Sequence, residues 1–193
     1  NMVQANSVAD SLNASFGVAP STTGFVLAAL TAAVIVGGIR RIGEVTQVLV
    51  PFMSVLYVTG GLAILFTNLP AVPGAIRLVL DGAFTGTAAA GGFAGSTVAL
   101  ALRHGVARGL FSNEAGLGSA PMVHAAAETD HPVRQGLYGI FEVFVDTLVV
   151  CTVTGLAILV TGVWDSGTTG AALSGEAFRQ GLPGTWGNLI VTT

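Results

Sequence analysis

Long apolar stretches dominate the pattern of side chains along the chain. A helix needs about 20 mostly apolar residues to cross the hydrocarbon core of a bilayer, and it satisfies its own backbone polar groups there. Residues 22–39, 49–68, 82–102 and 136–163 meet this demand, and they predict four membrane-spanning helices. The residues before Pro20 are interpreted as the tail of an earlier span, and the apolar run from Asn188 as the start of another.

The placement of arginine predicts how these spans are oriented. One side of the expected membrane carries five arginines: Arg40, Arg41, Arg103, Arg108 and Arg134. The other side carries Arg77, in a segment at residues 71–80 that is too short to cross, and Arg179. Because cytoplasmic loops are enriched in Arg and Lys, we expect the five-arginine side to be cytoplasmic and residues 71–80 to lie on the opposite membrane surface.

Composition supports an all-α, polytopic helical membrane protein. Hydrophobic residues make up 52% of the 193 positions and charged residues only 9%, whereas a soluble domain carries about 25% charged residues. Seven basic residues, all arginine, and a net charge of −3 give no basic patch, which argues against nucleic acid as a partner. The single cysteine, Cys151, excludes a disulfide framework and is interpreted as a small core side chain.

Glycine is concentrated in the third predicted span. The chain has 27 glycines, and each costs about 1 kcal/mol in a helix interior relative to alanine. One interpretation is close helix packing, because Gly82, Gly86 and Ala90 are four residues apart. The other is a broken helix around Gly91–Gly95, whose freed backbone groups and half-helix dipoles would hold a substrate and a cation. Thr87 would then add a hydroxyl, and Phe93 a pocket wall.

The segment from Arg103 to Gln135 is too polar to cross the membrane and too patterned for a loose linker. Within it, Ser112 or Asn113 is expected to cap a short helix that has Glu114 in its first turn. The functional alternative is a gate that closes the cytoplasmic path. The sequence leaves both interpretations open.

Two carboxylates lie inside the last predicted span. Glu142 and Asp146 are four residues apart, on one face of a helix, where like charges repel and a charge in hydrocarbon is expensive. Both should therefore face the bundle interior, water or a cation. Asp146 is the deeper of the two and is a candidate for cation coupling or gating, with a polar packing role as the alternative. Protonation of either carboxylate would allow proton coupling instead.

The sequence offers only weak evidence for a metal site. His124, Glu128 and His131 would share a helical face, but no cysteine or further histidine completes the set, and Pro132 breaks the helix at the third position. A solvated cytoplasmic face is the favoured interpretation, so no metal is expected beyond a transported ion.

Several motifs together resemble the alanine or glycine:cation symporter family, the sodium:alanine symporters. The longest reads Arg-Gly-Leu-Phe-Ser-Asn-Glu-Ala-Gly-Leu-Gly-Ser-Ala-Pro at 108–121, and it is joined by residues 1–7, 90–95, 131–136 and 146–152. The resemblance covers essentially the whole chain. It implies a LeuT-type fold of two inverted five-helix repeats, with a central site shared by two discontinuous helices. The glycine-rich span would be the one that opens the second repeat, which favours the broken-helix interpretation.

The resemblance also implies roles for individual residues. Gly91, Gly92 and Phe93 would contact the amino acid, and Gln4 would line the same cavity from an earlier span. Thr87 and Asp146 are the candidates for cation coupling or gating. The expected cofactor is none, with sodium as a co-transported ligand. The first discontinuous helix does not match any part of residues 1–193, so the chain is interpreted as an internal fragment of a single transmembrane transporter domain.

The expected function is therefore sodium-coupled symport of alanine or glycine by a multi-pass protein of the cell membrane. The expected partners are the small amino acid, sodium, the lipid bilayer and the remainder of the same carrier. Alternatives are proton coupling, a channel, or a structural membrane subunit that packs through small residues. An intramembrane serine enzyme at Ser96 is disfavoured, because no histidine lies inside a predicted span to act as its base.

Overall fold

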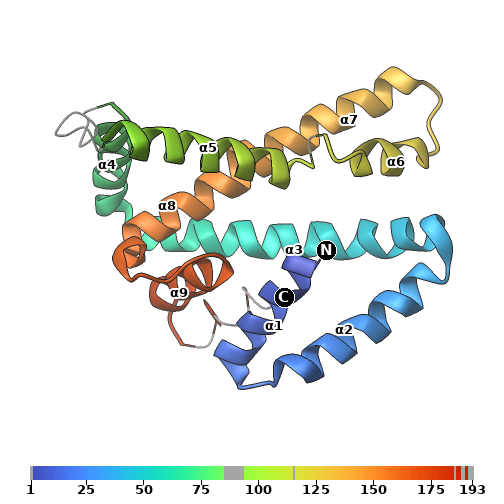
Figure 1. The fold of residues 1–193 in the computed structure, drawn as a ribbon, viewed down its shortest axis with the longest axis horizontal. Coiled ribbons are helices and arrows are strands. Elements are labelled where there is room, and N and C mark those ends of the chain that lie inside the picture. Colours follow the sequence, from blue (N-terminus) through green and yellow to red (C-terminus); the bar gives the residue numbers. More distant parts are fainter. Residues whose placement is uncertain (1, 85–93, 115, 185, 188–189, 191–193) are drawn as a thin grey trace. The chain divides into compact units, whose positions relative to one another are not determined.

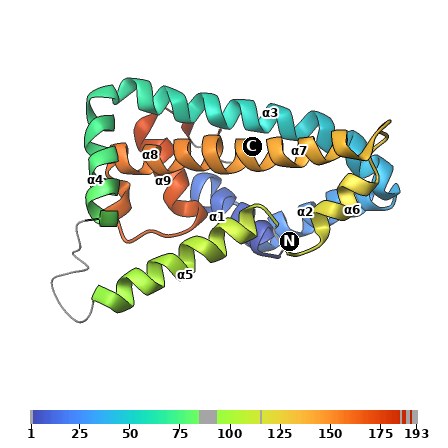
Figure 2. The ribbon, with the colours of Figure 1, turned by 90° about the horizontal axis from the view of Figure 1, so that it is seen from above.

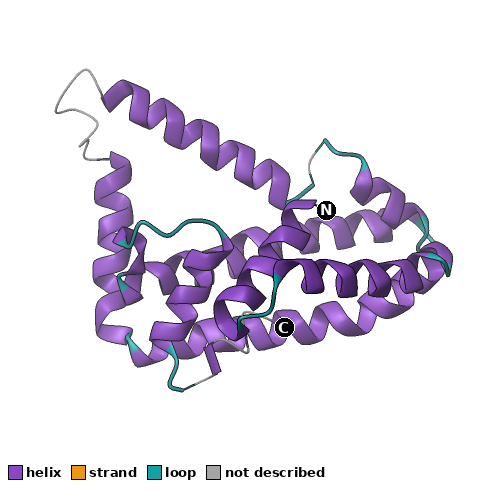
Figure 3. Ribbon diagram, turned by 60° about the horizontal axis from the view of Figure 1, so that its bottom comes forward, coloured by secondary structure: helices purple, strands orange, loops and turns teal. Residues whose placement is uncertain are grey.

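The computed structural model describes residues 2–84, 94–114, 116–184, 186–187 and 190. Within these residues the regular structure is helical and no strand occurs (Figure 3). This confirms the all-α class predicted from the sequence. The contacts divide the chain into two units, Asn1–Leu69 with Val153–Thr193, and Pro70–Thr152, and each is described by itself.

The first unit is built from five helices of the described chain and the end of a sixth. They are α1 (Met2–Phe16), α2 (Pro20–Ile35), α3 (Gly38–Thr67), the short 3₁₀ helix η3 (Val163–Asp165), α9 (Ala171–Gly181), and the part of α8 (Cys151–Thr161) that follows Thr152 (Figure 1). Helix α1 ends at Gly17, whose φ of 69° suits a residue without a Cβ. Pro20 then begins α2, where its missing N–H costs nothing.

Helix α3 is longer than the predicted span at 49–68. It begins at Gly38, so the expected loop at 40–48 is helical. Arginine and glutamate are good helix formers, and they continue the helix past the apolar stretch through Arg40, Arg41 and Glu44. A helix of 30 residues is about 45 Å long, against a hydrocarbon core of about 30 Å. The charged end of α3 therefore has the length to extend beyond the core.

The core of the first unit is small and lies where α3, α8 and α9 meet. Ile64, Ala157 and Phe178 are fully buried there. The ring of Tyr57 stacks on Phe178 with centroids 4.9 Å apart. The Tyr57 hydroxyl is 2.9 Å from the Thr154 hydroxyl, so one hydrogen bond joins α3 to α8 beside the stacked rings.

Glycines allow these helices to approach closely. A Cβ at Gly61 would overlap the side chain of Val153, and one at Gly60 would lie 2.9 Å from Ile190 Cδ1. A Cβ at Gly181 would lie 2.8 Å from the Ile64 side chain, and one at Gly187 would overlap the backbone of Phe178. The described packing glycines are therefore in α3 and near α9. The predicted packing positions, Gly82, Gly86 and Ala90, have no described side chains.

The second unit contains α4 (Val72–Phe84), α5 (Ala94–Ser112), α6 (Ser119–Ala125), α7 (Pro132–Phe144) and a π-helical turn at Val145–Val150, called the π turn below. The surface segment expected at 71–80 is part of α4, with Arg77 Nε 3.4 Å from Asp81 Oδ2. The predicted third span contains residues 85–93, which lie outside the described residues. Figure 2 shows α7, the π turn and α8 as one continuous helical run.

Two helices of the described chain are long and apolar enough to cross a membrane, Gly38–Thr67 and Pro132–Thr161. They contain all but one residue of the predicted second span and all but two residues of the fourth. Helix α2 is apolar but shorter than its predicted span, because Gly37 and Gly38 turn the chain after Ile35. Large apolar side chains on the two long helices are not covered by other parts of this chain: Phe52 is 63% exposed and Ile140 is 68% exposed.

We predict that Gly61→Ala destabilises the fold, whereas Gly43→Ala in the same helix does not. The new methyl group at position 61 would overlap Val153, and overpacking of this kind costs about 1–3 kcal/mol. Nothing lies within 4 Å of a Cβ at Gly43, so alanine there gains about 0.5–1 kcal/mol from helix propensity. Thermal unfolding of the two variants in detergent measures the difference. Equal stability of the two variants would contradict this packing.

Candidate coupling site

The π turn interrupts the regular α-helical hydrogen bonding of the apolar helix in the second unit. The backbone N–H of Cys151 bonds to the carbonyl of Asp146, five residues earlier, where an α-helix would bond four earlier. Such turns are rare and are often found at functional sites. Asp146 and Thr147 both lie in this turn, and Asp146 is half-buried.

The C-terminal end of α5 contacts the π turn through polar side chains. Ser112 Oγ donates a hydrogen bond of 2.5 Å to Asp146 Oδ2. Asn113 Nδ2 donates to Thr147 Oγ1 at 3.0 Å, and Thr147 Oγ1 is 3.3 Å from Asn113 Oδ1. We call Ser112, Asn113, Asp146 and Thr147 the α5–π cluster. A carboxylate that accepts a hydrogen bond from a hydroxyl through one oxygen keeps its second oxygen for a further ligand.

The predicted cap at Ser112 or Asn113 is wrong. Ser112 is the last residue of α5, and the Asn113 amide donates back to the Gly109 carbonyl at 3.0 Å. The next helix, α6, begins only at Ser119, after two glycines with positive φ, Gly116 and Gly118. Gly118, with a φ of 81°, is the N-cap residue of α6. Glu114 accepts a hydrogen bond from the Ser119 hydroxyl at the start of α6.

The two intramembrane carboxylates have separate partners. Asp146 bonds to Ser112, whereas Glu142 Oε2 lies 3.3 Å from His124 Nε2. The π turn begins between them, so the regular four-residue spacing assumed from the sequence does not continue through Asp146.

The helical histidine set is not formed. Helix α6 ends at Ala125, so Glu128 and His131 lie beyond it. His131 instead caps α7, where its Nδ1 accepts from the Val133 N–H at 3.2 Å, and Pro132 is the first residue of that helix. Within the described ranges, no three His, Cys, Asp or Glu side chains are placed to hold a metal ion.

The remaining predicted site residues fall into two groups. Thr87, Gly91, Gly92 and Phe93 lie outside the described residues. Gln4 is exposed on α1. Helical periodicity places it on the same face as Ser11 and Ser15, seven and eleven residues later.

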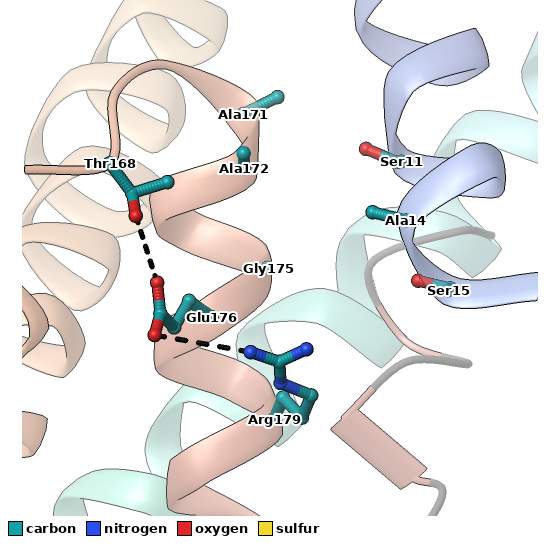
Figure 4. Close-up of a pocket in the computed structure, with 9 residues that line it drawn as sticks. All are labelled: Ser11, Ala14, Ser15, Thr168, Ala171, Ala172, Gly175, Glu176 and Arg179. Carbon is teal, nitrogen blue, oxygen red and sulfur yellow. Dashed lines mark hydrogen bonds and ion pairs between the residues drawn. The ribbon is translucent and has the colours of Figure 1, made fainter. Parts of the chain in front are cut away.

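Ser11 and Ser15 line a cavity of about 210 Å³ between α1 and α9 (Figure 4). On the α9 side, Glu176 accepts a hydrogen bond of 3.0 Å from Thr168 and lies 3.9 Å from Arg179. Figure 4 shows the two serines across the cavity from Ala171 and Ala172. Cys151, predicted to be a core side chain, is exposed within this chain.

Sequence reasoning did not find Thr147 or the partnership of Ser112 and Asn113 with the last span. One signal was available, since Asp146-Thr147 and Ser112-Asn113 are both pairs of consecutive polar residues next to apolar runs. Their pairing joins positions 34 residues apart, and that separation has no local signature in the sequence.

A family model described as the sodium:alanine symporter family matches residues 1–193. The chain belongs to this family. Members of the family are symporters rather than enzymes, which confirms the resemblance drawn from the motifs and the transport class it implied. The α5–π cluster therefore lies in a chain of the sodium:alanine symporter family.

Individual members of the sodium:alanine symporter family match along nearly the whole chain. The sodium/alanine symporter AgcS of Methanococcus maripaludis is 49% identical over 196 residues, covering 100% of this chain and 42% of its own length. An uncharacterized transporter of Haemophilus influenzae is 45% identical over 98% of this chain and 42% of its own length. The probable sodium/glutamine symporter GlnT of Bacillus subtilis is 40% identical, and the match covers 96% of this chain and 38% of the length of GlnT. The chain spans about two fifths of the length of these relatives.

We predict that the contact between Ser112 and Asp146 is energetically coupled. A double-mutant cycle of Ser112→Ala and Asp146→Ala should give a coupling free energy of about 1 kcal/mol in unfolding, because each single substitution removes the charge-assisted bond. The exposed pair Arg77 and Asp81 is the control, and its cycle should give about 0.3–0.5 kcal/mol. A zero coupling at positions 112 and 146 would show that the contact does not exist in the membrane.

Proposed function

We propose that this chain is part of a secondary active transporter that couples sodium entry to the uptake of a small neutral amino acid, alanine or glycine. The observation that carries the proposal is the family match over the whole chain. One relative is named for sodium and alanine. Another is named for sodium and glutamine, so pocket size within the family sets the choice, and one extra methylene is worth about 1–3 kcal/mol.

The proposed architecture is the LeuT-type inverted repeat, with residues 1–193 as a fragment of one transmembrane domain that is multi-pass in the cell membrane. Two long apolar helices support membrane insertion. In this architecture the substrate lies near the bilayer midplane, against backbone groups of discontinuous helices. Gly91, Gly92 and Phe93 would contact it, and Gln4 would line the same cavity. No cofactor is proposed beyond the transported ion.

Asp146 is the proposed coupling or gating residue, with Thr87 as a further oxygen donor. An ionised side chain inside an apolar helix is a functional candidate by default. The bond from Ser112 supports this role, because it fixes the carboxylate at the end of α5. A cation that binds the second oxygen of Asp146 would draw negative charge away from the oxygen that accepts from Ser112, and so weaken that hydrogen bond. Occupation of the site by sodium would therefore be communicated to the motif at 108–121.

We predict that the complete protein containing this chain takes up labelled alanine into vesicles only when a sodium gradient is imposed. Asp146→Asn keeps the size and the acceptor for Ser112 but removes the charge. It should raise the sodium concentration that gives half-maximal uptake by about tenfold or more, which corresponds to about 1.4 kcal/mol. Asp165→Asn is the matched control, because Asp165 lies in η3 outside the apolar helices.

Flux of alanine that does not depend on a sodium gradient would contradict the symport proposal and indicate a channel. Uptake driven by a proton gradient in the absence of sodium would replace sodium with protons as the coupling ion. If Asp146→Asn lowers thermal stability but leaves the sodium dependence unchanged, Asp146 is a packing residue and the coupling role is wrong.

A second prediction tests the glycine cluster. Gly92→Leu should abolish alanine binding, because a leucine side chain at an unwound midplane segment would fill the space of the substrate. Gly24→Leu, at a position where a Cβ meets nothing within 4 Å, is the control for a large side chain in an apolar helix. Alanine binding by isothermal calorimetry separates the two variants, and normal binding by Gly92→Leu would place the substrate elsewhere.

A further inference from the structure

His124 of α6 is held between two polar side chains of α7. Its Nδ1 lies 2.8 Å from Gln135 Nε2, and its Nε2 lies 3.3 Å from Glu142 Oε2. A Cβ at Gly139 would be 3.7 Å from His124 Nε2, so α7 passes directly beside the ring. Gln135, Gly139 and Glu142 are spaced four and three residues apart and share one helical face. The imidazole has a defined partner at each ring nitrogen.

The geometry fixes which protons the ring carries in each charge state. With the Gln135 amide as donor, Nδ1 is bare and the single ring proton is on Nε2, directed at Glu142. Protonation of the ring adds a hydrogen on Nδ1. A rotation of the Gln135 amide by half a turn then presents its carbonyl oxygen to that hydrogen, because the two ends of the amide have nearly the same shape. The same three side chains therefore satisfy the neutral and the protonated imidazole.

A protonated His124 and an ionised Glu142 would carry opposite charges 3.3 Å apart. Glu142 lies in the apolar run Pro132–Thr161, where an unpaired carboxylate is expensive. Uptake of a proton by His124 changes the net charge of the His124 and Glu142 side chains from −1 to zero. Titratable groups beside α6 in the sequence include Glu114, which accepts from Ser119, and Glu128, Asp130 and His131 in the connection to α7. Asp130 pairs with Arg134 at 2.9 Å, and His131 caps α7.

We propose that His124, Gln135 and Glu142 form a proton-binding site that takes up one proton on the imidazole and thereby strengthens the contact between α6 and α7. The site is separate from the α5–π cluster and does not depend on the identity of the transported substrate. Protonation gives the ring a positive charge and a second N–H donor, so the strength of the contact depends on the protonation state of the ring. The charged bond is about twice as strong as the neutral one.

Hydrogen exchange in the complete protein tests the site without relying on transport. Amides of residues 119–131, corrected for the intrinsic pH dependence of exchange, should exchange about fivefold more slowly at pH 6 than at pH 8 in the unmodified protein. His124→Gln should abolish this difference. Glu142→Gln, which keeps a hydrogen-bond acceptor but removes the charge, should reduce it. His104→Gln, on the exposed face of α5, should leave it unchanged.

Equal corrected exchange at the two pH values in the unmodified protein would overturn the proposal. So would a pH difference that survives in both His124→Gln and Glu142→Gln. If His104→Gln alone removes the difference, the proton binds on α5 instead. Because the readout is local exchange, each of these results stands whether or not the protein transports alanine.

Discussion

The second unit is organised by the need to compensate a carboxylate inside an apolar helix. Asp146 lies in the run Pro132–Thr161, where hydrocarbon gives an ionised group no solvation. Ser112 supplies a hydrogen bond, and the neighbouring pair Asn113 and Thr147 adds two more polar contacts. As a result, the end of α5 is fixed to the π turn. The polar motif at 108–121 is therefore an anchor for that helix end, and the carboxylate it holds is the proposed ligand for a coupling ion.

The first unit shows how helices associate when apolar burial contributes little. Lipid tails are as apolar as leucine, so close packing and hydrogen bonds between helices must supply the stabilisation. Gly60 and Gly61 let α3 approach the segments beside it, and Tyr57 joins α3 to both Phe178 and Thr154. The excess of glycine thus has a structural use within the described residues. The glycines at 91–95 carry the separate proposal of a substrate site.

The sequence predicted the all-α class and the two long spans, because the length of an apolar run is a local property. It placed helix ends poorly. The start of α3 is set by the Gly37–Gly38 turn and by arginines that extend the helix beyond its apolar part. The contact of Ser112 with Asp146 was missed, because it joins distant positions across a π turn that no local pattern marks. Asp146 itself could be singled out from the sequence, since charged residues are rare in an apolar span.

In the proposed symporter, sodium and a small amino acid bind to one protein with linked affinities. Linkage requires that sodium tightens alanine binding by the same factor by which alanine tightens sodium binding. Isothermal calorimetry of the complete protein measures both dissociation constants, with sodium replaced by choline at constant ionic strength in the reference. We predict a tightening of about tenfold or more, equal in the two directions. Alanine binding of the same affinity in sodium and in choline would contradict it.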